Sequence, residues 1–174
     1  KSVYHGKSEA PQTRAATAAL IREALMKAKK YADGIDSYNE DPENCDEPEY
    51  DDKNEALACV VKGSLPAHFH AHRADDIFTA VRIAKKFSLK YTLVHCTEGY
   101  LVAEELAKEG VSAILGPNMT DRSKPELKNL SFENPNACPI SSSVFGSSLS
   151  IPKRLFIISC SLLSSVFISL VTSF

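Results

Sequence analysis

The 174-residue sequence lacks the marks of several common protein classes. Its 20 basic and 22 acidic residues nearly balance, and it has no basic stripe of the kind that nucleic-acid binding requires. Its five cysteines form no CxxC pair and no short regular spacing, which indicates reduced thiols rather than a disulfide framework. No signal peptide follows Lys1. These absences argue against nucleic-acid partners and a disulfide-rich secreted domain, and they favour a cytoplasmic location.

Sequence motifs for phosphate binding and for elbow-type hydrolysis are also missing. There is no GxGxxG after a strand, no GxxxxGK[ST] and no GxSxG. Nucleotide binding and serine-elbow hydrolysis therefore have no support. The chain opens on Lys1 instead of Met, which favours a piece of a longer protein.

The first zone of the chain, up to about Glu55, predicts one helix and one acidic loop. "PQTRAATAALIREALMKAKKYADG" predicts a helix that Thr13 caps and Gly34 ends. Its apolar face recurs at steps of three and four: Ala18, Ile21, Leu25 and Ala28. Residues 33–55 then hold eleven acids against the single Lys53, which predicts a solvated acidic loop. A calcium loop is the alternative, but the oxygen spacing and central glycine of an EF-hand are absent.

The middle zone, 55–135, alternates between strand and helix patterns. Strands are expected at 66–72, 90–96 and 111–117, and helices at 74–87 and 99–110. The first of these helices has acids in its first turn and lysines in its last, as the helix macrodipole favours. Its apolar stripe comprises Ile77, Ala80, Val81, Ala84 and Phe87. This order predicts an α/β fold with right-handed βαβ crossovers and a parallel sheet.

From about Ala137 the composition changes. The segment is rich in serine and bulky apolar residues, and no charge follows Arg154. Residues 155–174 are long enough to span a membrane, although seven of them are Ser or Thr. Three interpretations stay open: out-of-frame or otherwise non-native sequence, a genuine tail anchor with a basic flank, and a folded segment without the helix–strand pattern.

Three of the five histidines stand at alternate positions in "AHFHAHRADD", residues 67–76. Strand alternation would place His68, His70 and His72 on one face, either as an edge facing water or as one wall of a metal site. His70 lies near the end of the first predicted strand and His95 at the end of the second. Since neighbouring strands are about 4.8 Å apart, we expect the imidazoles of His70 and His95 to lie within about 7 Å and to reach one metal ion.

The neighbours of these histidines allow further expectations. His68 sits deeper in its strand and is not expected to be a ligand. His72 and Arg73 are expected at the mouth of the site, and Asp75 or Asp76 as the cap of the following helix.

Cys96 lies beside His95 and raises the alternative of a thiol nucleophile. Adjacent strand residues point to opposite faces, so Cys96 is expected to be a buried, inert thiol.

Several motifs in combination resemble a known family. They are "FHAHRADDI" at 69–77, "HCTEGY" at 95–100, "ILGP" at 114–117 and "TDRSKPELKN" at 120–129, and "PQTRAATAALIREAL" at 11–25 adds a helix. Over about residues 1–136 the chain resembles the imidazolonepropionase-related branch of the amidohydrolase superfamily.

The resemblance implies an incomplete (β/α)8 TIM-type barrel, about strands five to seven with flanking helices, followed by the tail 137–174. It implies that His70 is a metal ligand and that His95 is a catalytic residue that binds metal or polarises the substrate. His72, Arg73 and Glu98 are expected to bind substrate or to support the ligands. Zinc is the expected divalent metal, with iron and manganese as alternatives. The implied reaction is attack of metal-activated water on the amide-type carbon–nitrogen bond of a small molecule, with a base passing a proton to the departing nitrogen.

The departures from the family pattern are equally specific. The family's HxH pair of strand one would lie upstream of Lys1, because "HFH" and "HAH" here belong to strand five. The strand-eight Asp would fall near the tail, and no Asp follows Asp121. We therefore expect a hydrolase fragment that is inactive by itself. The alternative is a non-catalytic barrel remnant, tethered to a membrane if the segment 155–174 is a genuine anchor.

Overall fold

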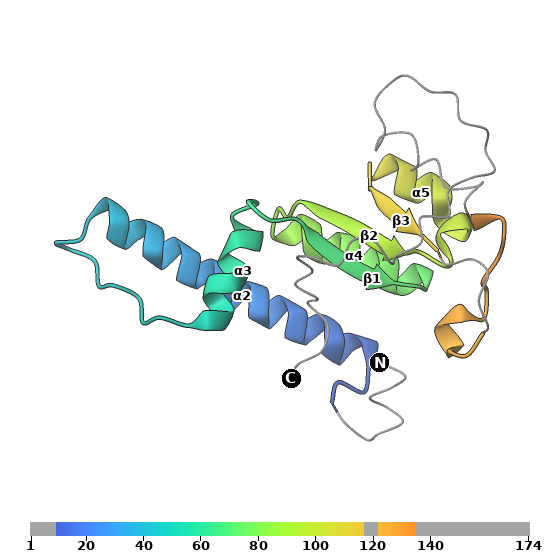
Figure 1. Ribbon diagram of the computed structural model, residues 1–174, viewed down its shortest axis with the longest axis horizontal. Helices are drawn as coiled ribbons and strands as arrows, with labels where there is room; N and C mark the ends of the chain where they lie inside the picture. Colours follow the sequence, from blue (N-terminus) through green and yellow to red (C-terminus); the bar gives the residue numbers. More distant parts are fainter. Residues whose placement is uncertain (1–9, 117–121, 135–174) are drawn as a thin grey trace, which may run out of the picture. The chain divides into compact units, whose positions relative to one another are not determined.

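The computed structural model describes residues 10–116 and 122–134 (Figure 1). The tail from residue 137, and with it the interpretations of an anchor or of out-of-frame sequence, lies outside the described residues. The chain divides into two compact units. The first unit takes in the described part of Lys1–Ala67 together with Val81–Tyr91, and the second takes in His68–Ala80 with the described residues after Thr92.

The first unit is built on a long helix, α2, Arg14–Glu40. As predicted, Thr13 caps it: its hydroxyl accepts a hydrogen bond from the Ala16 amide at 3.0 Å. The predicted apolar face is largely buried, with Ala18, Leu25 and Ala28 each at most 7 % exposed. The periodicity of the sequence therefore identified both the start of this helix and the side that packs.

The expected end of this helix at Gly34 is wrong, because α2 continues to Glu40. A Cβ atom added at Gly34 would lie 3.0 Å from the Pro48 Cγ. Gly34 therefore permits the close approach of a later segment, and it does not terminate the helix. Ion pairs of Asp33 with Lys29 and of Asp36 with Lys62 accompany this last part of α2.

The acidic stretch 33–55 is correspondingly shorter as a loop than predicted. It begins within α2 and ends within a second helix, α3, Asp52–Val61. The Asp51 carboxylate caps α3 by accepting hydrogen bonds from the amides of Lys53 and Asn54 at 2.9 and 2.8 Å. Residues 41–51 connect the two helices. The acidic residues at both ends of the stretch are thus parts of helices. Their charge favoured a loop, but helix capping and packing between α2 and α3 stabilise the helical conformation.

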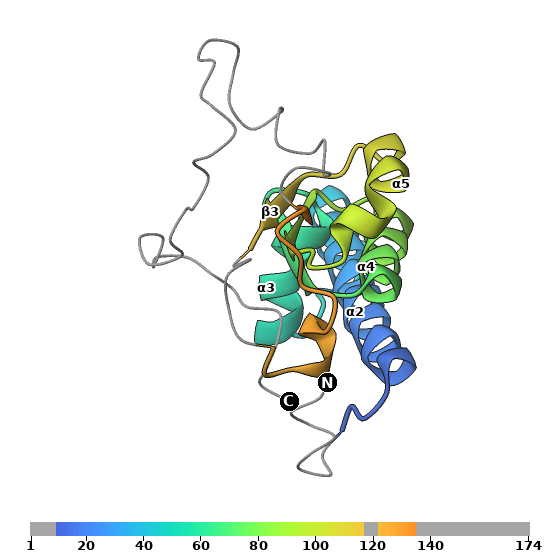
Figure 2. The ribbon, with the colours of Figure 1, turned by 90° about the vertical axis from the view of Figure 1, so that its right-hand side faces the viewer.

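Helices α2 and α3 lie side by side in both views (Figures 1 and 2). A small apolar cluster joins them: Tyr31, Ala32 and Ala58, with Ile35 and Val61 packed against it. The Tyr31 hydroxyl donates to a Glu55 carboxylate oxygen at 2.9 Å. The same unit contains Val81–Tyr91, the end of α4 and the chain leading into β2.

Strands and helices alternate after Ala67, as the sequence predicts. The elements are β1 Ala67–Ala71, α4 Ala74–Lys86, β2 Tyr91–His95, the 3₁₀ turn η1 Gly99–Val102, α5 Ala103–Lys108, β3 Ala113–Leu115 and a second 3₁₀ turn, η2, Pro125–Leu127. The predicted stripe of α4, from Ile77 to Phe87, is buried. The fold is therefore mixed α/β.

The three strands form one sheet in the order β1-β2-β3. β2 and β3 are parallel, with Leu93 opposite Ala113 and His95 opposite Leu115. Hydrogen bonds from the Ala67 amide to the Lys90 carbonyl and from the Cys96 amide to the Ala71 carbonyl show that β1 and β2 also run in the same direction. The ends of β1 and β2, with His70 and His95, consequently meet at one edge of the sheet.

No helix among the described residues is long and apolar enough to cross a membrane.

Candidate functional site

The imidazoles of His70 and His95 face each other at the carboxyl ends of β1 and β2. The His70 Nδ1 lies 3.1 Å from the His95 Nε2, and the ring centroids are 5.0 Å apart. Both residues belong to the second unit. The predicted convergence of these two rings within about 7 Å is confirmed. Their roles as ligand and catalytic group stay predictions.

The orientation of His95 depends on an unusual backbone. His95 and Cys96 both have positive φ angles, 76° and 42°, where residues other than glycine are uncommon. The chain therefore turns sharply at the end of β2. Such left-handed residues cost free energy and concentrate at functional sites, where surrounding contacts hold them. Here the turn brings the His95 ring between the other two members of the cluster, His70 and His72.

A hydrogen bond to the main chain selects the protonated nitrogen of His95. Its Nδ1 lies 2.8 Å from the carbonyl oxygen of Gly116. A carbonyl oxygen only accepts, so Nδ1 carries the proton and the Nε2 lone pair points at His70. Histidines that bind metals are commonly oriented in this way, with the second ring nitrogen donating to a carbonyl.

His72 is the third ring of the cluster. It follows the end of β1, and its ring stacks on His95 with centroids 4.7 Å apart and an interplanar angle of 11°. Its Nδ1 lies 2.8 Å from the Thr97 hydroxyl. This contact uses a ring nitrogen and ties His72 to the turn after β2, which fits a supporting position more closely than a ligand position.

Two rings of the cluster, His72 and His70, have lowered pKa values. Burial, reinforced by His95 and Lys124, lowers the pKa of His72 to about 4. Burial, with smaller contributions from His95 and His68, also lowers the pKa of His70. The lowered pKa values favour the neutral form of His70 and His72 at neutral pH, and neutral imidazole is the form that can donate a lone pair to a metal.

The expected helix cap at Asp75 or Asp76 is wrong, whereas the role of Arg73 at the mouth of the site stays a prediction. Asp75 and Asp76 lie inside the first turn of α4 and are not its cap. Asp75 instead forms an ion pair with Arg73, with Nε–Oδ1 3.0 Å, and this pairing raises the pKa of Arg73. The amide of Ala74, the first residue of α4, donates to a Glu98 carboxylate oxygen at 2.8 Å. The prediction failed because the cap comes from 24 residues away in the sequence.

Glu98 is buried, with only 8 % of its surface exposed. Its second carboxylate oxygen accepts a hydrogen bond from the Asn129 side-chain amide at 2.8 Å. Asn129 was part of a quoted motif but had no predicted role, and no periodicity connects two residues 31 positions apart. Thr97 and Gly116, which contact the histidines, were missed for the same reason.

The segment after β3 is joined to the same turn. The Tyr100 amide donates to the Asn134 side chain at 3.1 Å, and the Tyr100 hydroxyl donates to the Asn129 carbonyl at 3.2 Å. Cys96 is fully buried, as expected of an inert thiol. Hydrogen bonds thus join residues 129–134 to the turn after β2, which carries His95.

The two facing nitrogens have a spacing that suits a shared metal ion. Two nitrogens bound to zinc at 2.0–2.1 Å in tetrahedral geometry stand about 3.4 Å apart, and here the separation is 3.1 Å. Within 10–116 and 122–134 no group of three or more His, Cys, Asp or Glu side chains is placed to hold a metal ion. The described residues therefore fit two ligands of a metal site whose ligand set they do not complete.

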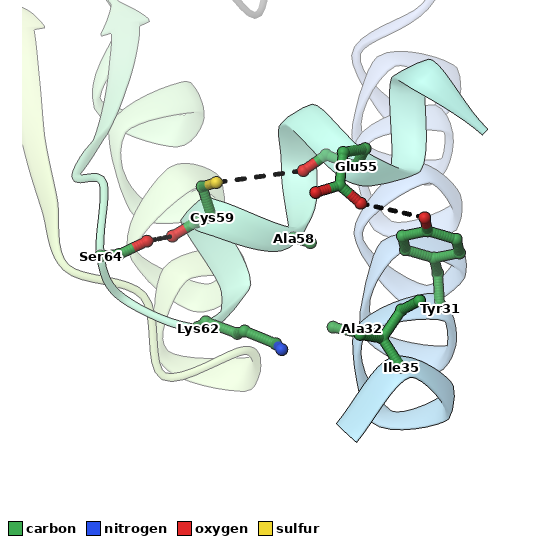
Figure 3. A pocket seen from close by; sticks show the side chains of 8 residues that line it. All are labelled: Tyr31, Ala32, Ile35, Glu55, Ala58, Cys59, Lys62 and Ser64. Atoms are coloured by element: carbon green, nitrogen blue, oxygen red, sulfur yellow. Dashed lines mark hydrogen bonds between the residues drawn. The ribbon is translucent and has the colours of Figure 1, made fainter. Parts of the chain in front are cut away.

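A separate cavity of about 120 Å³ lies in the first unit (Figure 3). Its lining comes from α2, α3 and the turn that follows: Tyr31, Ala32, Ile35, Glu55, Ala58, Cys59, Lys62 and Ser64. Burial and the hydrogen bond with Glu55 raise the pKa of Tyr31, so its hydroxyl stays protonated. None of the residues predicted for the site lines this cavity, and its polar groups bond mainly to one another.

Comparison with known proteins finds one instructive similarity. The chain is 37 % identical to an amidohydrolase from Thermotoga maritima MSB8, known from its crystal structure, with a TM-score of 0.71. The match covers 78 % of this chain and 35 % of that protein, so this chain spans about a third of its length. No protein-family model matches the chain, and no curated protein matches it. The similarity supports a relationship of this chain to the amidohydrolase superfamily.

Proposed function

We propose that the chain is part of a metal-dependent amidohydrolase of the imidazolonepropionase-related branch. The proposed parent enzyme hydrolyses amide-type carbon–nitrogen bonds of small molecules. Its fold is a (β/α)8 barrel, of which β1, β2 and β3 are strands five to seven. The observation that carries the proposal is the 3.1 Å approach of the His70 Nδ1 and the His95 Nε2 at the ends of adjacent parallel strands.

The chain's own residues would act as follows. His70 and His95 would hold the divalent metal, with zinc expected. When bound, the metal would supply Lewis-acid chemistry and lower the pKa of a water molecule. The Gly116 carbonyl accepts a hydrogen bond from the His95 Nδ1, so in the neutral ring the lone pair is on Nε2, which faces His70. The hydrogen bond between His72 and Thr97 keeps the third ring stacked on His95.

The isolated chain is proposed to be catalytically inactive. It supplies two of the ligands in the described residues, and a metal site with missing protein ligands binds weakly. A non-catalytic barrel remnant is the second candidate function, favoured by that same incomplete set of donors. The two candidate functions differ in whether this segment supports catalysis when the remaining metal ligands are supplied.

A segment exchange tests the proposal. Residues 67–116 of this chain would replace the matching segment of the Thermotoga amidohydrolase, and folding would be checked by circular dichroism. We expect the hybrid to bind zinc and to retain the amidohydrolase activity of the unmodified Thermotoga protein. The variant His95→Ala in the hybrid should lose at least about 100-fold in kcat/KM. A folded hybrid that binds zinc and has no turnover would support the non-catalytic remnant.

The coding DNA offers an independent test. The nucleotides around the codon of Ala137 can be read in all three frames. A strand pattern ending in Asp in another frame would support out-of-frame sequence after that point and a catalytic parent protein. Turnover by the 174-residue chain itself, measured with a panel of cyclic amides, would contradict the proposed inactivity.

A further inference from the structure

The buried carboxylate of Glu98 joins three segments of the second unit. One oxygen accepts from the Ala74 amide at the start of α4, and the other accepts from the Asn129 side chain, each at 2.8 Å. These partners lie 24 positions before and 31 positions after Glu98. Taking a carboxylate out of water is unfavourable unless hydrogen bonds compensate it, and here both oxygens have a partner.

Glu98 also belongs to a set of contacts between the turns after β1 and β2. The Cys96 amide donates to the Ala71 carbonyl at 2.9 Å, and the Glu98 amide donates to the His72 carbonyl at 2.8 Å. The His72 ring contacts Thr97 from the same side. We call residues 71–74 and 96–98 the turn pair. Hydrogen bonds connect the two turns at Ala71 and at His72, and the Glu98 side chain adds a third connection at Ala74.

The location of Glu98 explains why a carboxylate suits this position. The Ile77 amide donates to the Arg73 carbonyl at 2.9 Å, so Arg73 occupies the N-cap position and Ala74 is the first residue of α4. The amide of Ala74 lies in the first turn, where amides have no acceptor within the helix, and it donates to Glu98 instead. A negative charge is favoured there by the partial positive charge of the helix N-terminus.

We propose that Glu98 is a positioning residue, which holds the turn after β1 and the segment around Asn129 against the turn after β2. By holding the turn pair together, Glu98 keeps the His72 ring stacked on His95 and the His95 ring facing His70. That this arrangement of rings serves metal binding rests on the proposed function. That Glu98 maintains the arrangement does not depend on it. Glu98 is thereby assigned to supporting the histidines, and its carboxylate is engaged by protein groups instead of substrate.

Nuclear magnetic resonance of the 174-residue chain without metal tests this assignment. In the native chain we expect nuclear Overhauser effects between the His72 and His95 rings. In Glu98→Ala the nuclear Overhauser effects between the two rings should disappear. Exchange of the Ala74 amide proton with solvent should accelerate roughly tenfold, as expected for the loss of one hydrogen bond. In Glu98→Gln the ring contacts and the slow exchange of the Ala74 amide proton should both be retained. The glutamine side chain can accept a hydrogen bond from the Ala74 amide and donate one to the oxygen of a flipped Asn129 side chain.

Two controls separate positioning from general stability. Leu106→Ala removes a fully buried side chain of α5 and should lower the unfolding midpoint while leaving the ring contacts intact. Glu105→Ala removes an exposed carboxylate of α5 and should change neither. If Glu98→Ala fails to fold, Glu98→Asp replaces it, since a side chain shorter by one methylene group cannot reach both partners.

Ring contacts that persist in folded Glu98→Ala, or in Glu98→Asp, would overturn the assignment. Loss of the ring contacts in Leu106→Ala would also overturn it, because any loss of stability would then be enough to separate the His72 and His95 rings. Titration of the native chain with Co²⁺ is a separate measurement. No uptake of Co²⁺ would count against the proposed function, while the ring contacts, measured without metal, would still decide the role of Glu98.

Discussion

The Nδ1 of His95 donates a hydrogen bond to the Gly116 carbonyl, and this bond decides which nitrogen of the ring faces His70. It connects the end of β2 to the residue directly after β3. The left-handed backbone at His95 makes the contact possible. A main-chain carbonyl after β3 therefore orients the His95 ring at the end of the neighbouring strand β2.

Removing either facing imidazole should weaken the binding of divalent metal. The native chain is expected to bind Co²⁺ weakly, and His70→Ala or His95→Ala should weaken it by more than the roughly 10–100-fold typical of losing an outer partner. His68→Ala, from the same strand, is the matched control and should bind as the native chain does. Absorption titration with Co²⁺ measures the effect. Loss of binding in His72→Ala with His70 intact would contradict the ligand assignment.

Stability should fall in mildly acidic solution because of His72. The pKa of His72 is about 4 in the folded chain and near 6.5 in an ordinary environment. Between these values the unfolded chain binds the proton and the folded chain does not, so the contribution is complete above pH 6.5 and is lost as the pH falls toward 4. Urea unfolding at several pH values measures this, and His72→Gln should flatten the profile. An unchanged profile in His72→Gln would assign the dependence to other groups.

Gly34 and Pro48 should show coupled effects on stability. Alanine in place of a helical glycine normally stabilises by about 1 kcal/mol, but a Cβ at Gly34 would lie 3.0 Å from the Pro48 Cγ. Gly34→Ala should therefore give no gain or a loss, whereas in the background of Pro48→Ala it should stabilise by about 1 kcal/mol. A double-mutant cycle of urea unfolding tests the coupling. Equal effects in both backgrounds would show that the approach of Pro48 does not constrain Gly34.

Removal of residues 137–174 should raise the soluble yield. The sequence from Leu155 onward is apolar and carries no charge, so it must be covered, inserted in lipid or aggregated. Expression of the chain with and without this segment, with comparison of soluble and membrane fractions, measures the effect. Recovery of the longer form as a folded monomer only with detergent would support a membrane anchor instead.

The local pattern of the sequence was sufficient for the elements and for the convergence of two histidines. Thr13 marks a helix start because its hydroxyl bonds an amide three residues on. The βαβ order follows from apolar spacing, and adjacent parallel strands end at one edge, which brought His70 and His95 together. The helix cap depends on an interaction between residues close in sequence. The meeting of the two histidines depends on a general property of parallel sheets, in which neighbouring strands end on the same side.

Contacts distant in sequence decided the rest. Helix α2 continues through Gly34, which lets Pro48 approach closely, and α4 is capped by Glu98 from the turn after β2. The orientation of His95 depends on a left-handed backbone and on the Gly116 carbonyl after the next strand. Residue spacing carries no information about such partners, because their free energy arises only after the segments have packed. The sequence by itself therefore determined which histidines meet, and the tertiary structure decided which atoms face each other and what holds them there.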